Sequence, residues 1–301
     1  MQGLRPPAPY LADLVPYDPK YLPARIYLNA NESPYGLPEP VVRRLMEAVS
    51  QQEFHRYPDP LAKELRAQIA RINGMAAENV LLGNGGDELL FDIMLAWGGS
   101  GRRLLTAPPS FSSYELDAKL TDTTIVEIPR KERPATAPTL ELALDEDAVL
   151  ARVAQGDIDV VMLASPNNPT GDALSEDFVL ALLGASDAIV LIDQAYVEFA
   201  GERYDLTRHL AAHSNLILLR TFSKAYALAG VRLGYLLGSA PVINELCKVR
   251  QPYSVDAFSA LAGREVLRCA DEIAGFVTES VAERARVSAA LAALPGVEVF
   301  A

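Results

Sequence analysis

One lysine stands where lysines are rare, directly after an apolar segment typical of a buried strand. Lys224 closes the sequence TFSK, which follows LILLR (216–220), and Arg232 comes shortly after it. Such a lysine is either a paired structural charge or a nucleophile. Desolvation and cationic neighbours lower the pKa of an amine and make it nucleophilic. Thr221 and Ser223 are hydroxyl donors suited to a phosphate, and the guanidinium of Arg232 can donate two parallel hydrogen bonds to the same group.

A carboxylate ends a second apolar segment. AIVLID (188–193) closes with Asp193, and QAYVEF follows it. Burying a carboxylate is costly unless it is paired, and a protonated heterocyclic nitrogen is one good partner. Tyr196 comes three residues later, so we expect it to reach the same pocket.

A glycine-rich turn follows VLLG (80–83), in the sequence GNGGDE. Gly85 and Gly86 let the backbone approach a ligand closely, and Asp87 can cap a following helix. A helix N-terminus of this kind binds anions such as phosphate. The turn matches neither GxxxxGK[ST] nor GxGxxG, so a plain tight turn remains the alternative.

Two further segments carry candidate ligands at their ends. RRLLTA (102–107) leads into PPSFSSYE, which brings Phe111 to the end of a strand. DVVMLA (159–164) leads into SPNNPTG, which offers the side-chain amide of Asn168. Taken alone, Phe111 is an ordinary core or lid residue and SPNNPTG is ordinary turn chemistry.

Together these residues indicate one ligand. Five of the seven predicted strands are followed by such groups: an anion-binding helix start, an aromatic ring, an amide, a carboxylate with a tyrosine, and a lysine with an arginine. This set suits a phosphorylated aromatic aldehyde that has a ring nitrogen and a phenolic oxygen and is held on the lysine as a Schiff base.

The elements that must position these residues alternate along the chain. Strands are predicted over 80–83, 102–107, 123–128, 159–164, 188–193, 216–221 and 231–237. Helices are predicted over 38–51, 60–73, 87–96, 112–120, 145–155, 175–184 and 224–229. Continuous apolar strands between helices favour an α/β fold, with a mostly parallel seven-stranded sheet covered on both faces. Ligands of such sheets bind beyond the carboxyl ends of the strands.

Both ends of the chain differ from this pattern. Residues 1–36 contain many prolines and are predicted to form an extended arm. From Asp256 onward the pattern is helical, and PGVEVFA at the end predicts a turn that enters a strand.

Composition excludes several classes of function. The chain has 301 residues, 50% of them hydrophobic, and a net charge of −12, so binding to nucleic acid through a basic face is not expected. Two cysteines and three histidines without ligand spacing argue against disulfides and a metal site. No secretory signal and no membrane-length apolar run is evident, which favours a cytoplasmic protein without a membrane partner.

The motifs resemble a known family. The chain is similar to the fold-type I pyridoxal-phosphate aminotransferases, which have an aspartate-aminotransferase-like large domain, and within them to the histidinol-phosphate branch. The matching stretches are LNANESPYG (28–36), RYPDP (56–60), GNGGDE (83–88), SPNNPTG (165–171), IDQAYVEF (192–199) and TFSKAYALAGVRLGY (221–235). The lysine motif and SPNNPTG are specific to the superfamily, whereas the two N-terminal stretches point to the branch.

The resemblance implies roles at the reacting centre. Lys224 forms the Schiff base with pyridoxal phosphate and moves the proton. Asp193 keeps the ring nitrogen protonated, while Tyr196 and Asn168 bind the phenolic oxygen and Phe111 stacks on the ring.

The resemblance also assigns residues around that centre. The phosphate is bound by Gly85, Gly86, Asp87, Thr221, Ser223 and Arg232. Tyr57 reaches the phosphate from a second subunit, which implies a homodimer, and Tyr35 and Asn31 are substrate contacts.

The implied activity is amino transfer between L-histidinol phosphate and 2-oxoglutarate in histidine biosynthesis. The alternatives on the same scaffold are an aromatic amino-acid aminotransferase, a threonine-phosphate decarboxylase, or a cofactor-binding fragment without turnover. A nucleotide-binding module that uses the glycine turn alone is the remaining alternative. The expected domains are a large one over 37–245 and a small α+β one formed by 1–36 and 246–301. We expect the small domain to be incomplete at its C-terminus, because relatives continue with a substrate-binding arginine that has no counterpart here.

Overall fold

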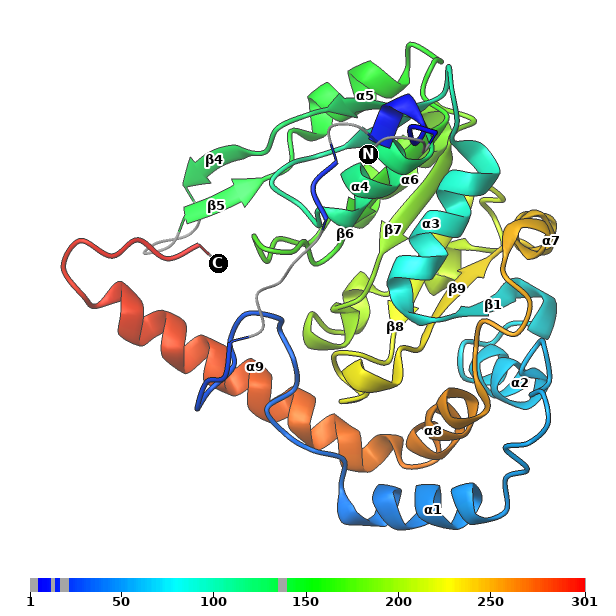
Figure 1. The fold of residues 1–301 in the computed structure, drawn as a ribbon. Helices are drawn as coiled ribbons and strands as arrows, with labels where there is room; N and C mark the ends of the chain where they lie inside the picture. The colour runs from blue at the N-terminus through cyan, green and yellow to red at the C-terminus, as the bar shows by residue number, and fades with distance from the viewer. Residues whose placement is uncertain (1–4, 12–13, 17–21, 135–139, 301) are drawn as a thin grey trace.

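The computed structural model describes residues 5–11, 14–16, 22–134 and 140–300. A seven-stranded sheet occupies its centre, in the order β1-β9-β8-β7-β6-β2-β3 (Figure 1). The strands are β1 (Val80–Gly83), β2 (Arg103–Thr106), β3 (Thr124–Glu127), β6 (Val160–Ala164), β7 (Ile189–Asp193), β8 (Leu216–Thr221) and β9 (Gly234–Gly238). All neighbouring strands from β3 to β8 pair in parallel, and only β9 runs antiparallel to both of its neighbours. The predicted mostly parallel sheet is therefore confirmed.

Helices cover both faces of the sheet. One face packs against α3 (Gly85–Trp97), α4 (Ser113–Leu120) and α7 (Ala240–Val249). The other face packs against α2 (Lys63–Ile72), α5 (Glu146–Val153) and α6 (Glu176–Ala185). The same core continues to α8 (Ala257–Leu267), which packs on α2, and to α1 (Glu39–Ser50), which packs on α8. β6, β7, β8 and β9 are buried along their whole length, as expected for strands that lie between two helical layers.

Two elements extend away from these layers (Figure 1). The hairpin of β4 (Lys131–Pro134) and β5 (Leu140–Ala143) was not predicted from the sequence. The long helix α9 (Ala270–Ala292) buries only Ile273, and the N-terminal arm lies along it in the figure. Within the described residues, no helix is long and apolar enough to cross a membrane.

Two predictions around the lysine are wrong. Residues 224–229 do not form a helix, because the backbone turns back and the Leu228 amide donates to the Phe222 carbonyl at 3.0 Å. The next strand begins at Gly234 rather than at 231, because Arg232 takes a left-handed backbone conformation with φ of 56°. A short 3-10 helix, η6 (Ala229–Val231), lies between them.

The final predicted strand is also wrong for the described residues. After α9, residues 294–300 form a turn and irregular chain, with an isolated bridge at Phe300. The arm prediction holds for most of its described part, since only η1 (Pro9–Leu11) is helical there. Residues 1–4, 12–13 and 17–21 of the predicted arm and residue 301 lie outside the description.

Candidate active site

A cavity of about 350 Å³ lies beyond the carboxyl ends of β6, β7 and β8. The loops after these strands form one wall, and the arm and α9 form the other. The lining includes Asn31, Glu32, Ser33, Asn168, Tyr196, Phe199, Lys224, Phe276, Ser280 and Arg284. Three of the predicted site residues, Asn168, Tyr196 and Lys224, therefore meet in one cavity, as the rule for parallel sheets requires.

Asp193 ends β7 and is 6% exposed. One carboxylate oxygen accepts a hydrogen bond from the Tyr114 hydroxyl at 2.8 Å, and the other accepts from the Ala195 amide at 2.9 Å. Burial raises the pKa of Asp193 against the effect of these two donors. Among the described side chains none forms an ion pair with this carboxylate, so its charge is stabilised by the two hydrogen bonds and, at longer range, by the Lys224 ammonium.

Lys224 reaches the cavity from the turn after β8. Its Nζ donates to the Ala30 carbonyl of the arm at 2.8 Å and lies 5.7 Å from the centre of the Tyr196 ring. Burial lowers the pKa of the Lys224 ammonium; the Glu32 carboxylate opposes this effect, and the Arg232 guanidinium adds to it. A lysine with a lowered pKa keeps a larger share of neutral, nucleophilic amine.

Tyr196 faces the same cavity from the loop after β7. Its hydroxyl accepts a hydrogen bond from the Asn31 side chain at 3.1 Å. Burial raises the Tyr196 pKa, and the hydrogen bond from Asn31 opposes that shift. The arm thus contacts both Tyr196 and Lys224 directly.

The glycine turn lies against Arg232. The Arg232 Nη2 atom donates to the Asp87 carboxylate at 2.8 Å, within the first turn of α3. Gly85 has φ of +78°, and a Cβ atom there would stand 2.7 Å from the same Nη2 atom. A Cβ on Gly234 would stand 2.9 Å from the Gly85 carbonyl carbon. Glycines are therefore needed at both positions for the guanidinium to reach the start of the helix.

Comparison with known proteins agrees with this geometry. Residues 24–299 match the model of the family "Aminotransferase class I and II". A histidinol-phosphate aminotransferase of Carboxydothermus hydrogenoformans is 40% identical over 284 residues, which are 94% of this chain and 78% of that protein.

The chain belongs to the class I and II aminotransferases.

Two solved structures support the fold assignment. The crystal structure of histidinol-phosphate aminotransferase from Sinorhizobium meliloti in complex with pyridoxal-5'-phosphate aligns with a TM-score of 0.78 and 26% identity, over 87% of this chain and 69% of that one. A Thermus thermophilus aspartate aminotransferase mutant aligns with a TM-score of 0.79 and 23% identity, over 97% of this chain and 78% of that one. The second likeness shows an aspartate-aminotransferase-like fold, as predicted.

Other predicted site residues of this aminotransferase do not line the cavity. The Thr221 hydroxyl donates to the Ser223 hydroxyl at 3.0 Å and accepts from the Ser223 amide at 3.1 Å. Phe111 is half-buried and packs edge-on against Tyr114, with ring centres 5.8 Å apart. Gly86 lies in the first turn of α3, where a Cβ would stand 3.3 Å from a Leu219 methyl group.

Two predicted contacts lie elsewhere. Tyr57 is 83% exposed and stacks on Tyr253, with ring centres 4.8 Å apart, outside the cavity lining. Tyr35 stacks on Phe276 of α9 with ring centres 4.7 Å apart, so its ring closes the gap between the arm and that helix.

Sequence reasoning missed two residues that the structure brings to the site. Tyr114 binds Asp193 although 79 positions separate them, and no spacing rule links such a pair. Arg284 of α9 lines the cavity, where its Nη1 atom donates to the Phe199 carbonyl at 3.4 Å. The sole signal for Arg284 was its place in a helical pattern, which does not tell what the helix faces.

Proposed function

We propose that this aminotransferase transfers the amino group between L-histidinol phosphate and 2-oxoglutarate, as a step of histidine biosynthesis, with pyridoxal phosphate as its cofactor. The proposal rests on the position of Lys224, whose amine lies in the cavity beside Tyr196 and above the end of β7, where Asp193 is buried. The choice of substrate follows the similar proteins, because the relative from Carboxydothermus hydrogenoformans carries that activity in its name.

The residues present fit pyridoxal phosphate. Asp193 is a buried carboxylate that accepts two hydrogen bonds and forms no ion pair with a described side chain, and a protonated ring nitrogen is the partner that its chemistry calls for. The space between Gly85 and Arg232 admits no Cβ, which is the close backbone approach that a phosphate at a helix start requires. Ser223 and Thr221 add hydroxyl groups, and the backbone amides of Gly85, Gly86 and Asp87 complete the phosphate contacts.

When bound, pyridoxal phosphate withdraws electrons from the substrate's Cα and holds the amino group between the two half-reactions. Lys224 attaches the cofactor and then carries a proton to and from the substrate's Cα, a role that suits an amine with a lowered pKa. Asp193 keeps the ring nitrogen charged. Tyr196 and Asn168 orient the phenolic oxygen, and Phe111 covers the ring.

The substrate side of the cavity is formed by the arm and α9. Arg284 and Lys224 are the two cationic side chains in the cavity lining. Since Lys224 serves the cofactor, we assign Arg284 to the phosphate of the substrate, with Asn31 as a further contact. The predicted contact of Tyr35 would be indirect, because its ring stacks on Phe276 of the lining. A guanidinium forms strong charge-assisted hydrogen bonds to phosphate.

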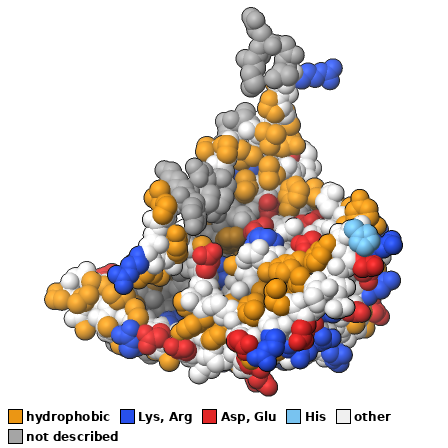
Figure 2. Space-filling view, turned by 60° about the horizontal axis from the view of Figure 1, so that its bottom comes forward, with side chains coloured by type: hydrophobic (Ala, Val, Ile, Leu, Met, Phe, Trp, Pro, Cys, Tyr) orange, Lys and Arg blue, Asp and Glu red, His pale blue; other side chains and the backbone are white. Residues whose placement is uncertain are grey.

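A homodimer belongs to this proposal. Tyr57 is exposed and lies outside the cavity of its own chain, which leaves it free to reach a second subunit. Helix α1 also exposes Val42 and Met46, and Figure 2 shows hydrophobic side chains in groups among charged ones on this side of the molecule. Sedimentation equilibrium tests the dimer, and a monomer at micromolar concentration would contradict it.

The cytoplasmic location of the protein stays a prediction. The division into a large domain of residues 37–245 and a small domain of residues 1–36 with 246–301 also stays a prediction.

The function is tested with the purified chain and pyridoxal phosphate. Addition of L-histidinol phosphate should convert the aldehyde absorbance of the cofactor into that of the amine form, and 2-oxoglutarate should reverse the change and yield glutamate. Release of CO₂ from O-phospho-L-threonine would instead indicate the decarboxylase. An aromatic amino acid that converts the cofactor faster than L-histidinol phosphate would indicate the aromatic aminotransferase.

A further inference from the structure

Arg220, the residue that precedes the TFSK motif, is buried in β8 with 8% exposure. We propose that it is a positioning residue, which fixes the loop after β7, and with it Asp193 and Tyr196, relative to the strand that carries Lys224. This proposal rests on the function proposed above and assigns a role to a side chain that touches neither the cavity nor the reacting groups.

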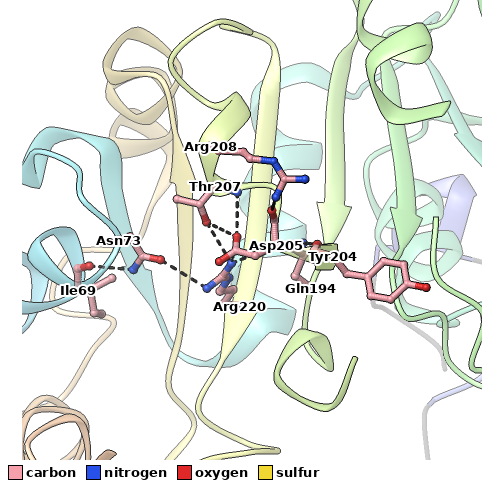
Figure 3. A network of polar contacts seen from close by, with 8 residues as sticks. All are labelled: Ile69, Asn73, Gln194, Tyr204, Asp205, Thr207, Arg208 and Arg220. Carbon is pink, nitrogen blue, oxygen red and sulfur yellow. Dashed lines mark hydrogen bonds and ion pairs between the residues drawn. The ribbon is translucent and has the colours of Figure 1, made fainter. Parts of the chain in front are cut away.

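The guanidinium joins three segments of the chain (Figure 3). Its Nη2 atom donates to the Asp205 carboxylate at 2.6 Å, to the Thr207 hydroxyl at 3.1 Å and to the Gln194 side-chain oxygen at 3.1 Å. Its Nη1 atom donates to the Asn73 side chain, just after α2, at 3.4 Å. One side chain of β8 thus fixes both ends of the loop between Gln194 and Thr207.

Gln194 is the link to the reacting groups. It is fully buried and directly follows Asp193. Its backbone amide donates to the Leu219 carbonyl of β8 at 2.8 Å, and its side-chain amide donates to the Tyr204 carbonyl at 2.7 Å. The same residue therefore binds β8, the guanidinium and the far part of the loop, and Tyr196 lies two positions further along.

The network acts from the face of the sheet opposite to Asp193. Side chains alternate along a strand, and Leu218 packs in the core on one face of β8 whereas Leu219 packs on the other. Arg220 shares the face of Leu218, while Asp193 binds Tyr114, which packs on the face of Leu219. A change at Arg220 therefore leaves every predicted cofactor contact chemically intact.

Burying an arginine costs free energy, because its charge is removed from water. Burial lowers the pKa of Arg220, but Tyr235 and the Asp205 and Glu198 carboxylates outweigh this effect and raise it overall. The Arg220 Nε atom is nevertheless buried without a hydrogen-bond partner. An apolar side chain of similar size at such a place is often neutral or stabilising. Unlike an apolar side chain, the planar guanidinium has donors in a rigid arrangement and so holds several acceptors in one geometry.

The test is the variant Arg220→Met, with Arg220→Lys as the conservative variant. A displacement of the reacting groups by about 1 Å can lower the rate by about a hundredfold. We expect kcat of Arg220→Met to fall by about 10- to 100-fold while KM stays within about threefold, and Arg220→Lys to recover part of the loss. Hydrogen exchange of the amides at 194–197, measured without substrate, should rise by about tenfold or more.

A matched control separates positioning from stability. Glu265 of α8 is 3% exposed and pairs with Arg44 and Arg268 away from the cavity. Glu265→Gln should lower stability without a change in kcat or in exchange at 194–197. If Arg220→Met does not fold, Gln194→Met is tested in its place. It removes the hydrogen bonds of the Gln194 side chain and keeps the ion pair between Arg220 and Asp205. The same changes in hydrogen exchange and in kcat are expected.

The proposal is wrong if exchange at 194–197 is unchanged, or if kcat falls only in proportion to the folded fraction. Failure of the proposed function would look different, since the wild-type chain would then not convert L-histidinol phosphate, whereas the exchange result does not depend on substrate.

Discussion

The two walls of the cavity are built in opposite ways. The first wall, called the rigid wall below, stands on β7 and β8, which are buried along their whole length. The side chains at the ends of these strands are fixed by hydrogen bonds from several directions. The wall formed by the arm and α9 is mostly exposed: residues 22–32 all lie at the surface, and α9 buries a single residue. Under the proposed function, cofactor chemistry depends on the rigid wall, whereas substrate recognition depends on exposed segments that can change at little cost to the core.

The largest effect is expected at the lysine of the rigid wall. Lys224→Ala removes the amine that we propose attaches the cofactor and moves the proton, so activity should fall by more than about a thousandfold. Covalent attachment, measured by borohydride reduction and mass, should be lost. Lys119→Ala, on the exposed side of α4, is the control and should behave as the wild type; normal turnover by Lys224→Ala would contradict the account.

The next effect is expected at the carboxylate. Asp193→Asn keeps the shape and removes the charge that should hold the ring nitrogen protonated. We expect kcat to fall by about a hundred- to a thousandfold, with cofactor still bound. Tyr114→Phe removes one hydrogen bond to Asp193 and should cost about tenfold. Equal losses in the two variants, measured by kcat and by cofactor absorbance, would show that the tyrosine contact rather than the charge matters.

The exposed wall should respond through substrate affinity. Arg284→Ala removes the proposed partner of the substrate's phosphate, so KM for L-histidinol phosphate should rise by about tenfold or more while cofactor binding is unchanged. Arg286 of the same helix pairs with Glu283 and does not line the cavity. Arg286→Ala is therefore the matched control. If KM rises as much in Arg286→Ala as in Arg284→Ala, the assignment of Arg284 to the substrate's phosphate is wrong.

The smallest effect on chemistry, though not on stability, is expected in the core behind the rigid wall. Burial, with the nearby Glu88 carboxylate, raises the pKa of Asp92 to about 7 from 3.8, against the effect of Arg250. The folded protein then binds more protons than the unfolded one between about pH 4 and 7, so the free energy of unfolding falls as the pH rises through that window.

Asp92→Asn removes this ionisation. The variant should be more stable than the wild type at pH 8, by on the order of 2 kcal/mol, and gain far less at pH 5, with kcat unchanged. Urea unfolding at the two pH values measures the difference, and Asp187→Asn at an exposed position serves as control. An equal gain at both pH values would mean that Asp92 does not titrate with a raised pKa.

The rigid wall was largely predictable, because apolar runs identify buried strands and parallel strands bring their carboxyl ends together. This reasoning placed Asp193 at the end of one buried strand and Lys224 just after another, and both positions are confirmed. The turn over 224–229 was not predicted, because Ala227 takes a left-handed conformation, with φ of 54°, that its residue type does not favour. The turn is held by contacts with Phe222, on which Tyr226 packs and to whose carbonyl the Leu228 amide donates. The contact between Tyr114 and Asp193 joins helix α4 to the end of β7, which are distant in sequence.

The exposed wall was harder to predict. The periodicity of α9 indicates a helix but not the direction in which it leaves the core, so the placement of Arg284 in the cavity had no local signal. The arm was identified by its prolines and by the motif around Asn31. Its contacts with Lys224 and Tyr196 depend on how the chain folds back over the sheet.

The central claim is that Lys224 is the nucleophile of an aminotransferase. The purified chain is mixed with pyridoxal phosphate, reduced with borohydride, digested, and its peptides are mapped by mass. The account predicts one modified residue, Lys224, in near-stoichiometric amount. A folded sample in which the modification lies on surface lysines and Lys224 stays unmodified would contradict it.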